Sequence, residues 1–325
     1  QLYGNNRIGD IYMEYTKLGN TDIEVSKLCI GCMSFGKAGI MHDWTLDEAE
    51  SEKVIKHALD LGINFFDTAN CYSGGTSEEY LGKAIKNNVA RDQVVIASKV
   101  YFNDGRLSKE AINREIDGTL RRFGTDYLDL YIIHRFDFDT PIEETMGALS
   151  DIVRSGKALY VGLSNYKEEE TRKAVKILKE NGTPCLIHQP RYNMLERWVE
   201  DGLLSALDEN GVGCICFSPL AQGALTDKYL KGIPAGSRAS REGTTVAQRY
   251  LSDEQLEKIK QLNQLAEERG QTLAQMAIAW ILRRPEVTTV LVGASRVSQL
   301  DDSLAALECT GFSEDELKKI DEILA

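Results

Sequence analysis

The stretches INFFD (residues 63–67), VVIASK (residues 94–99) and LDLYIIH (residues 128–134) are short apolar runs, and each ends in a charged or ionisable side chain. Segments with apolar residues at helical spacing lie between them, at residues 77–89 and 109–123. Apolar runs that alternate with helical segments are typical of buried parallel strands joined by crossover helices. The three stretches therefore predict part of an α/β fold whose strands carry polar side chains at their carboxyl ends.

The same alternation continues along most of the chain. Each expected strand is followed by at least one expected helix. The strands are expected at residues 28–33, 63–66, 94–99, 128–133, 158–163, 185–188, 212–217 and 288–292. Eight such units in a chain of 325 residues predict an α/β fold of the (β/α)8 TIM-barrel type.

The two ends of the chain add to this barrel. A β-hairpin is expected over residues 14–28, where it would close the amino-terminal mouth of the barrel, and additional helices are expected at residues 297–307 and 313–324. Residues 1–12 are polar, and we interpret them as a disordered leader or cloning remnant. Residues 13–325 are then a single barrel domain, because no change in composition marks a second one.

Two helix starts and one long loop carry local expectations. Thr45 is expected to cap the helix that follows it, and Ser77 to cap the helix at residues 77–89. The longest irregular segment, residues 221–247, is rich in Gly, Ser and Arg. Loops of that length are usually functional or mobile.

The composition indicates a large core and an acidic surface. Hydrophobic residues make up 42% of the chain, and 38 basic against 50 acidic side chains give a formal net charge of −12. This charge disfavours nucleic acid and anionic membranes as partners. No apolar run approaches the ~20 residues that span a bilayer. We therefore expect a cytoplasmic protein that acts on a small molecule.

The seven cysteines lie mostly in apolar runs, which favours reduced core thiols. Cys214 and Cys216 are separated by one residue and have no histidine cluster beside them, so we expect no metal site. Cys71 precedes Tyr72 and could be a reactive thiol, although nothing in the sequence shows that it is activated.

Four side chains are expected to meet at the carboxyl ends of the strands: Asp67, Tyr72, Lys99 and His134. A tyrosine has a pKa of about 10 in water and is a poor acid at neutral pH. A lysine ammonium lowers that pKa, and an aspartate keeps the lysine charged and in place. Tyr72 could then protonate a developing alkoxide while His134 Nε2–H holds the carbonyl oxygen. Each residue alone has an ordinary structural explanation, but together they predict a proton-donating site.

Reduction of a carbonyl also needs a hydride donor, and the sequence shows no redox-active residue or metal set. Residues 31–37 resemble a phosphate loop, but Ala38 stands where the Ser or Thr that binds Mg²⁺ is required. No G-x-G-x-x-G follows a strand, so a Rossmann site is not supported. The last strand–helix junction, residues 292–296, brings small residues and Arg296 to a helix start, which predicts an anion site.

The segment DTANCYSGGTSE, residues 67–78, resembles the D-T-A-x-x-Y-x-x-G-x-S-E signature of the aldo-keto reductases. The resemblance covers residues 14–323 and is closest to the long-loop branch that includes potassium-channel β subunits and many bacterial reductases. It implies an enzyme that reduces aldehydes or ketones, including sugar-derived carbonyls, to alcohols with NADPH. Further matching motifs lie at residues 98–100, 133–135, 162–165, 189–193, 217–220 and 293–296.

The resemblance assigns a role to each matching residue. Asp67, Tyr72, Lys99 and His134 match the catalytic tetrad of the family, with Tyr72 as the general acid. The residues that it assigns to NADPH/NADP are Ser164, Asn165 and Gln189 at the nicotinamide carboxamide, Phe217 on the nicotinamide ring, Ser218, Leu220 and Ala221 at the pyrophosphate, Arg238 in the loop that clasps the cofactor, and Ser295, Arg296, Gln299, Asp302 and Ser303 at the 2′-phosphate and adenine. Further residues assigned to the cofactor are Gly31, Cys32, Met33, Pro219 and Gly293.

Two residues depart from the family pattern, and two tryptophans have an open role. Phe136 replaces the usual proline after His-Arg, which could alter the loop after the fourth strand. Ser303 stands where asparagine is common at the adenine contact. Trp44 and Trp198 either line a substrate pocket or pack in the core.

Two other functions are compatible with the same fold, because function resides in the site. One is a cofactor-sensing regulatory protein of the channel β-subunit type, with weak or no turnover. His134 favours catalysis, since those subunits resemble this pattern with an amide side chain at the matching position. A sugar-phosphate lyase or isomerase would need a paired general-base set, which the sequence lacks. The physiological substrate and the oligomeric state stay open.

Overall fold

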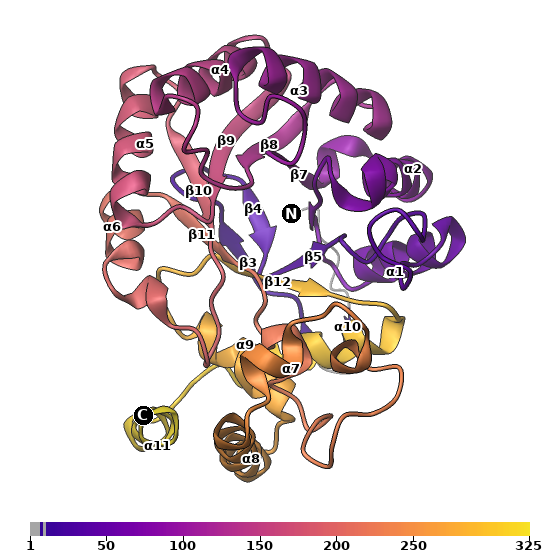
Figure 1. The fold of residues 1–325 in the computed structure, drawn as a ribbon, viewed down its shortest axis with the longest axis vertical. Coiled ribbons are helices and arrows are strands. Elements are labelled where there is room, and N and C mark those ends of the chain that lie inside the picture. Colours follow the sequence, from indigo (N-terminus) through magenta and orange to yellow (C-terminus); the bar gives the residue numbers. More distant parts are fainter. Residues whose placement is uncertain (1–6, 9–10) are drawn as a thin grey trace.

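The structure, a computed structural model, describes residues 7–8 and 11–325. Eight strands form a closed barrel in the order β10-β11-β12-β5-β6-β7-β8-β9, and all neighbouring pairs are parallel (Figure 1). The predicted (β/α)8 barrel is confirmed. Its strands are β5 (Leu28–Gly31), β6 (Phe65–Asp67), β7 (Val95–Val100), β8 (Leu128–Ile133), β9 (Ala158–Ser164), β10 (Cys185–Gln189), β11 (Gly213–Cys216) and β12 (Thr289–Gly293).

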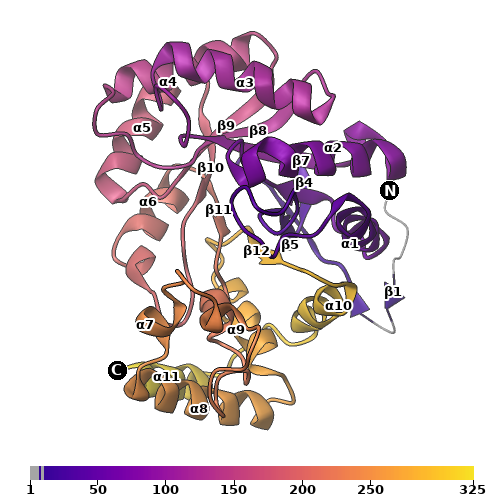
Figure 2. The same ribbon diagram turned by 45° about the vertical axis from the view of Figure 1, so that its right-hand side comes forward.

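Helices surround the barrel, and a second group of helices gathers below it in the view of Figure 1. In that lower group α11 lies against α8, as Figure 2 also shows. No helix among the described residues is long and apolar enough to cross a membrane. The helices are α1 (Glu48–Asp60), α2 (Thr76–Asn88), α3 (Lys109–Phe123), α4 (Ile142–Arg154), α5 (Glu168–Glu180), α6 (Leu203–Glu209), α7 (Val246–Tyr250), α8 (Asp253–Glu268), α9 (Leu273–Leu282), α10 (Val297–Ala305) and α11 (Glu314–Leu324).

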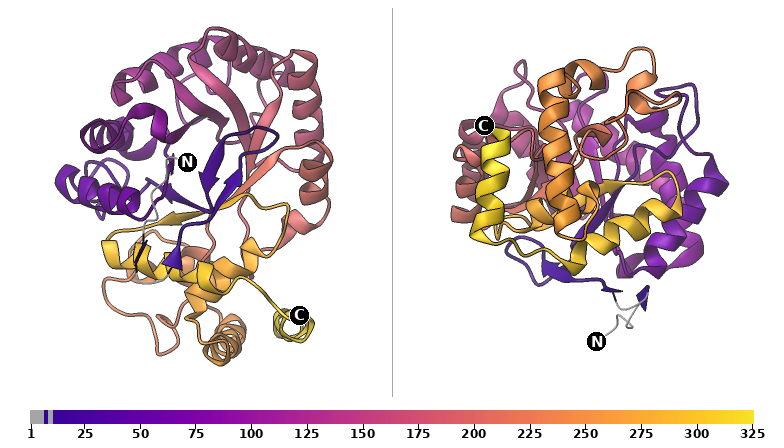
Figure 3. Two further views of the ribbon diagram at one scale, coloured as in Figure 1. Left: turned by 180° about the vertical axis from the view of Figure 1, so that it is seen from behind. Right: turned by 90° about the horizontal axis from the view of Figure 1, so that it is seen from below.

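An antiparallel hairpin of β3 (Tyr15–Lys17) and β4 (Glu24–Ser26) lies across one end of the barrel (Figure 3). Leu18 and Val25 of this hairpin are fully buried in the same apolar cluster as the inward-facing strand residues. The backbone N–H of Ser26 donates to Asn64 Oδ1 over 2.8 Å, which ties the hairpin to the start of β6. The hairpin therefore closes the amino-terminal mouth of the barrel, as predicted.

The segment before this hairpin is described only in part. The strand β1 (Arg7–Ile8) pairs antiparallel with β2 (Ile11–Tyr12), and Ile11 packs against the main core. The expected disordered leader at residues 1–12 includes residues 1–6 and 9–10, which lie outside the described residues. The domain boundary at residue 13 stays a prediction.

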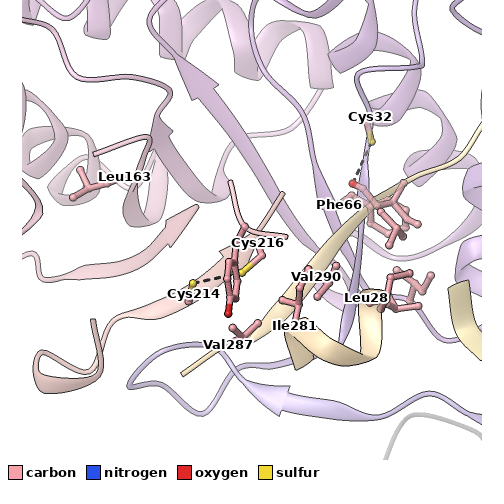
Figure 4. Close-up of a cluster of buried hydrophobic side chains, with 14 of the residues drawn as sticks. Leu28, Cys32, Phe66, Leu163, Cys214, Cys216, Ile281, Val287 and Val290 are labelled. Carbon is pink, nitrogen blue, oxygen red and sulfur yellow. Dashed lines mark hydrogen bonds between the residues drawn. The ribbon is translucent and has the colours of Figure 1, made fainter. Parts of the chain in front are cut away.

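Side chains alternate along each barrel strand between two apolar clusters. Phe65 and Leu130 belong to the smaller cluster, which also contains the buried hairpin residues and fills the barrel. Phe66 and Tyr131, their neighbours in the chain, belong to the larger cluster between the barrel and the helices. Figure 4 shows part of this larger cluster, with Leu28 of β5, Phe66 of β6 and Val290 of β12 among its labelled residues. This two-residue period decides which side chains can reach the inside of the barrel.

Both predicted helix caps are wrong, because a different residue takes the cap position of each helix. The helix α1 begins after Asp47, whose carboxylate accepts the N–H of Glu50 over 2.9 Å, so the expected Thr45 lies outside the helix. The N-cap residue of helix α2 is Gly75, which directly precedes its first residue, Thr76. Ser77 is the second residue of the helix, two positions past the cap, and its hydroxyl pairs instead with Thr68 Oγ1 and Cys32 O.

Candidate active site

The alternation inside the barrel places three of the predicted tetrad residues. Asp67 is the register partner of Ala97, and Lys99 is the partner of Ile132. Both partners belong to the cluster that fills the barrel, and register partners in parallel strands share a face. His134 follows Ile132 by two residues. Asp67, Lys99 and His134 therefore all face inward, at the carboxyl ends of β6, β7 and β8.

A buried ion pair forms the floor of this group. Lys99 Nζ donates to Asp67 Oδ1 over 2.5 Å and to Thr68 O over 2.7 Å. Gln189 Nε2 donates to the other carboxylate oxygen of Asp67 over 3.0 Å. Burial raises the pKa of Asp67, against the opposing effect of Lys99. Burial alone would lower the pKa of Lys99, but Asp67 and Tyr72 raise it above its usual value, so the ammonium stays charged.

Tyr72 reaches the same group from the loop after β6. Lys99 Nζ lies 5.1 Å from the centre of the Tyr72 ring, and the His134 ring meets it edge to face at 5.9 Å between centres. Burial raises the pKa of Tyr72 to about 12, while Lys99 acts in the opposite direction. The expected effect of the lysine is therefore present, but the loss of solvation outweighs it. The phenol is protonated at neutral pH.

His134 is nearly enclosed between aromatic rings. The Phe102 ring lies 5.1 Å from it, at 86°. Burial, together with the charges of Lys99 and Arg135, lowers the pKa of His134 well below its usual value. The imidazole is therefore neutral at physiological pH, and its Nδ1 has no hydrogen-bond partner among the described residues. A neutral histidine beside a protonated tyrosine presents two groups that can donate to one carbonyl oxygen.

A cavity of about 520 Å³ opens above these side chains. Three tetrad residues, Asp67, Tyr72 and His134, lie in its wall, and Lys99 lies beneath Asp67. Most residues that the sequence assigned to a cofactor line the same cavity. They are Gly31, Cys32, Met33, Ser164, Asn165, Gln189, Phe217, Ser218, Pro219, Leu220, Arg238, Gly293, Ser295, Gln299 and Ser303.

Three assigned residues lie outside the cavity wall. Ala221 is fully buried beside it. Asp302 turns away, because its Oδ1 accepts a hydrogen bond from Gln275 Nε2 over 3.0 Å. Arg296 is the residue that precedes the first turn of α10. The cofactor contacts of these three residues stay predictions, as do those of the residues in the wall.

The start of α10 forms one end of the cavity. Ser295 donates to Gln299 Oε1 from both its backbone N–H, over 2.8 Å, and its hydroxyl, over 3.1 Å. Further along α10, Ser303 Oγ donates to the Gln299 backbone carbonyl over 2.9 Å. The free N–H groups and the dipole of a helix start favour an anion here.

Cationic side chains gather along the same wall, and two of them were not identified from the sequence. Lys228, Arg238 and Arg241 line the cavity, and none has a carboxylate partner among the described residues. The two guanidinium groups lie against Trp44, at 5.5 Å for Arg238 and 5.3 Å for Arg241. Burial, and next the charge of Arg241, lowers the pKa of Arg238. The Arg-rich character of residues 221–247 was the available signal.

Backbone strain is concentrated at the cavity. Asn165, Ser218, Ala221 and Gln222 have positive φ angles of 57°, 54°, 48° and 58° although none is glycine. Such conformations persist only where the surroundings hold them, and they cluster at ligand sites. Asn165 illustrates this, because its Nδ2 donates to His134 O over 3.0 Å and so joins the end of β9 to the tetrad.

The aromatic residues singled out in the sequence separate into two groups. Trp44 lines the cavity, whereas Trp198 does not and is 37% exposed elsewhere on the surface. Phe136, which replaces the usual proline, packs edge to face against Phe138 at 4.8 Å and Tyr166 at 5.1 Å. The loop after β8 is therefore anchored by an aromatic cluster.

The Cys71 thiol shows no sign of activation. Burial raises the pKa of the Cys71 thiol, which opposes formation of the reactive thiolate. The sulfur atoms of Cys214 and Cys216 lie 3.8 Å apart in β11 (Figure 4). Across the described ranges 7–8 and 11–325, no three His, Cys, Asp or Glu side chains converge as a metal site would require.

Comparison with known proteins agrees with this geometry. The model of the aldo/keto reductase family matches residues 27–325. This chain belongs to the aldo/keto reductase family. Among its relatives, L-glyceraldehyde 3-phosphate reductase of Escherichia coli is 42% identical over 96% of this chain and 93% of that protein. A Schizosaccharomyces pombe protein described as a voltage-gated potassium channel subunit beta is 37% identical over 94% and 92%. Versiconal hemiacetal acetate reductase of Aspergillus parasiticus is 36% identical over 91% and 93%.

As an aldo/keto reductase, the chain is an oxidoreductase of a family that acts on carbonyl groups. The predicted likeness to both bacterial reductases and channel subunits is confirmed.

Proposed function

We propose that this aldo/keto reductase is an NADPH-dependent enzyme that reduces aldehydes or ketones to alcohols. The observation that carries the proposal is the position of Tyr72 and His134 in the wall of a cavity that is also lined by unpaired cations. The two uncharged donors suit a carbonyl oxygen, and the cations suit the phosphates of a dinucleotide. NADPH, when bound, supplies the hydride.

The side chains divide the remaining work. We assign the proton of the neutral imidazole to His134 Nε2, from which it holds the carbonyl oxygen against the phenol. Tyr72 O–H gives its proton to that oxygen as the alkoxide develops. The phenolate that results lies beside the Lys99 ammonium, whose charge stabilises it. Asp67 keeps the ammonium in place through the 2.5 Å bond between Lys99 Nζ and Oδ1.

The remaining lining residues fit a dinucleotide from end to end. Ser164, Asn165 and Gln189 offer amide and hydroxyl groups for a carboxamide near the tetrad, and Phe217 offers a flat ring. At the far end, the start of α10 and Arg238 offer donors for phosphate oxygens. Unpaired guanidinium groups in a partly buried wall are costly without a counter-charge. An anionic ligand removes that cost.

The relatives suggest where to look for a substrate. One acts on L-glyceraldehyde 3-phosphate and another on versiconal hemiacetal acetate, as their names state. The assay we propose follows NADPH oxidation with a panel of short aldehydes, sugar-derived and phosphorylated aldehydes, and ketones.

Tyr72→Phe is the decisive variant in this assay. It keeps the ring but removes the acid, so turnover should fall by ~10²–10⁴ while NADPH binding is retained. Tyr131→Phe is the control, because Tyr131 is fully buried and its hydroxyl has no partner among the described residues. If wild-type protein binds NADPH but reduces no member of the panel, the regulatory alternative replaces this proposal.

A further inference from the structure

A buried carboxylate outside the tetrad joins three elements behind the active site. Glu78 in the first turn of α2 is fully buried. Its Oε1 accepts hydrogen bonds from Ser98 Oγ over 2.6 Å and Thr119 Oγ1 over 2.9 Å. Its Oε2 accepts from Arg122 Nε over 2.5 Å. One side chain therefore ties α2 to strand β7 and helix α3.

Both ends of this network lie next to tetrad residues. Ser98 is the residue before Lys99 in β7. Glu78 follows, by three residues, the short 3-10 helix Tyr72–Gly75, which we call the Tyr72 turn. The carboxylate thus lies between the segment that carries the lysine and the segment that carries the tyrosine.

The Tyr72 turn is strained. Ser73, Gly74 and Gly75 have positive φ angles of 48°, 65° and 93° in succession. Ser73 is not glycine, so this conformation costs free energy and persists only where neighbouring groups hold it. The position of the Tyr72 hydroxyl depends on those neighbours.

The first neighbour is the loop after β5. A Cβ atom at Gly36 would lie 2.4 Å from Ser73 Cβ, so the Gly36 backbone packs directly against the Ser73 side chain. The backbone N–H of Lys37 also donates to Thr76 Oγ1 over 2.8 Å. This side of the turn is held by the packing of Gly36 against Ser73 and by one hydrogen bond.

The second neighbour is Arg122 itself. A Cβ atom at Gly75 would lie 2.6 Å from Arg122 Cδ and 2.8 Å from its Nε, so the arginine lies directly against the turn backbone. Glu78 fixes the guanidinium in that place, and Thr119 Oγ1 accepts a further bond from Arg122 Nη2 over 3.3 Å. The far side of the turn is therefore backed by a side chain that is itself held by a buried ion pair.

We propose that Arg122 and Glu78 are positioning residues for Tyr72. They act through the Tyr72 turn and touch neither substrate nor cofactor. The inference rests on the proposed function, in which Tyr72 is the acid, and adds the device that keeps its hydroxyl in reach of the carbonyl oxygen. A displacement of about 1 Å at a reacting group is enough to cost ~10²-fold in rate.

The test compares two arginines of similar exposure. Arg122 is 24% exposed, and Arg91 is 22% exposed in an ion pair with Asp129 over 2.8 Å at the amino-terminal end of the barrel. Arg122→Met and Arg91→Met each remove one such pair, so both should lower Tm. Only Arg122→Met should lower kcat, by at least about tenfold, with the dissociation constant of NADPH within about twofold of wild type. Arg122→Lys keeps the positive charge but lacks the planar array of N–H donors of the guanidinium, so it should recover part of kcat.

Hydrogen exchange of residues 71–77, followed by mass spectrometry, gives a readout that does not need turnover. Arg122→Met should speed exchange in this segment by about tenfold or more, on the scale of 1.4 kcal/mol per factor of ten, and Arg91→Met should not. A wild-type protein without turnover would contradict the proposed function, while the exchange comparison would still decide the role of the pair. If Arg122→Met does not fold, Arg122→Lys is compared with Arg91→Lys instead. Unchanged kcat and unchanged exchange in a folded Arg122 variant would overturn the inference.

Discussion

Burial decides the protonation of Tyr72 and His134, the two side chains that we propose hold the carbonyl oxygen. It raises the pKa of Tyr72 to about 12 and lowers the pKa of His134 well below its usual value. Both groups are therefore uncharged donors at physiological pH. The tyrosine needs no tuning to hold its proton. In the proposed reaction, the lysine would stabilise the phenolate after the proton has left.

If Lys99 stabilises the Tyr72 phenolate, Lys99→Met should change the reverse reaction, which is alcohol oxidation with NADP. There Tyr72 must act as a base, so the rate rises with pH as the phenol ionises. Lys99 lowers the pKa of Tyr72 more than Asp67 raises it. Its removal should therefore raise that pKa and displace the rising limb of kcat/KM to higher pH. If the rising limb of kcat/KM stays at the same pH in a Lys99→Met variant that is still active, Lys99 does not tune the pKa of Tyr72.

At the scale of elements, the alternation of side chains made the site predictable. Asp67, Lys99 and His134 end apolar runs, and the two-residue period inside the barrel brings them together. The wall cations Lys228 and Arg241 were not predictable. Their loop has no period, and tertiary contacts alone bring it across the cavity to Trp44.

The helix starts show the same limit. Asp47 precedes α1 and Gly75 precedes α2, whereas the sequence pattern favours the nearby hydroxyl residues Thr45 and Ser77. A hydroxyl such as that of Ser77 has several possible partners, and the sequence does not say which one it takes. Here Ser77 bonds to Thr68 and Cys32, because the loops of β6 and β5 close over it.

The Tyr72 turn yields a stability prediction at this scale. Gly75→Ala adds a methyl group against Arg122 at a φ of 93°, whereas Gly124→Ala adds one at a φ of 67° with no atom within 4 Å. Both variants carry a left-handed alanine, which costs about 1–2 kcal/mol. Only Gly75→Ala adds steric overlap, worth about 1–3 kcal/mol more. Urea unfolding of both variants measures the two free energies of unfolding. Equal decreases in the two variants would show that the Arg122 side chain moves away from the added methyl group without cost.

The helix α10 yields a prediction about cofactor choice. Arg296 stands at its start, where N–H groups and the helix dipole favour an anion. A phosphate on the 2′-oxygen could accept charge-assisted bonds from this guanidinium, and NADH lacks that phosphate. Arg296→Ala should weaken NADPH binding by about 1.5–3 kcal/mol and leave NADH binding almost unchanged.

Quenching of tryptophan fluorescence measures both affinities. Arg121→Ala on α3 is the control, because it removes an exposed arginine that has no carboxylate partner among the described residues and does not line the cavity. Equal losses for NADPH and NADH in Arg296→Ala would mean that Arg296 contacts some other group.

At the scale of the whole molecule, the cavity joins distant parts of the chain. Its wall includes β5 near the beginning, β12 and α10 near the end, and the loop that carries Lys228 and Arg241. The chain as a whole carries a formal net charge of −12, yet the charged side chains along this wall beyond the tetrad are cations. Mutual repulsion of those cations is a cost that the folded protein bears when no anion is bound.

A ligand that spans this cavity should therefore stabilise the entire barrel. Binding to the folded state alone contributes RT ln(1 + [L]/Kd), or ~2.7 kcal/mol at a ligand concentration of 100 times Kd. For a domain of this size that corresponds to a rise in Tm of a few degrees.

NADPH should raise Tm more than NADH at equal concentration, because only NADPH adds the 2′-phosphate. The gain should shrink with added salt, since charge pairing is screened. Thermal unfolding with each cofactor, repeated for Arg296→Ala, measures this. A Tm that NADH raises as much as NADPH does, in wild type and variant alike, would show that the cations of the wall do not select for the extra phosphate.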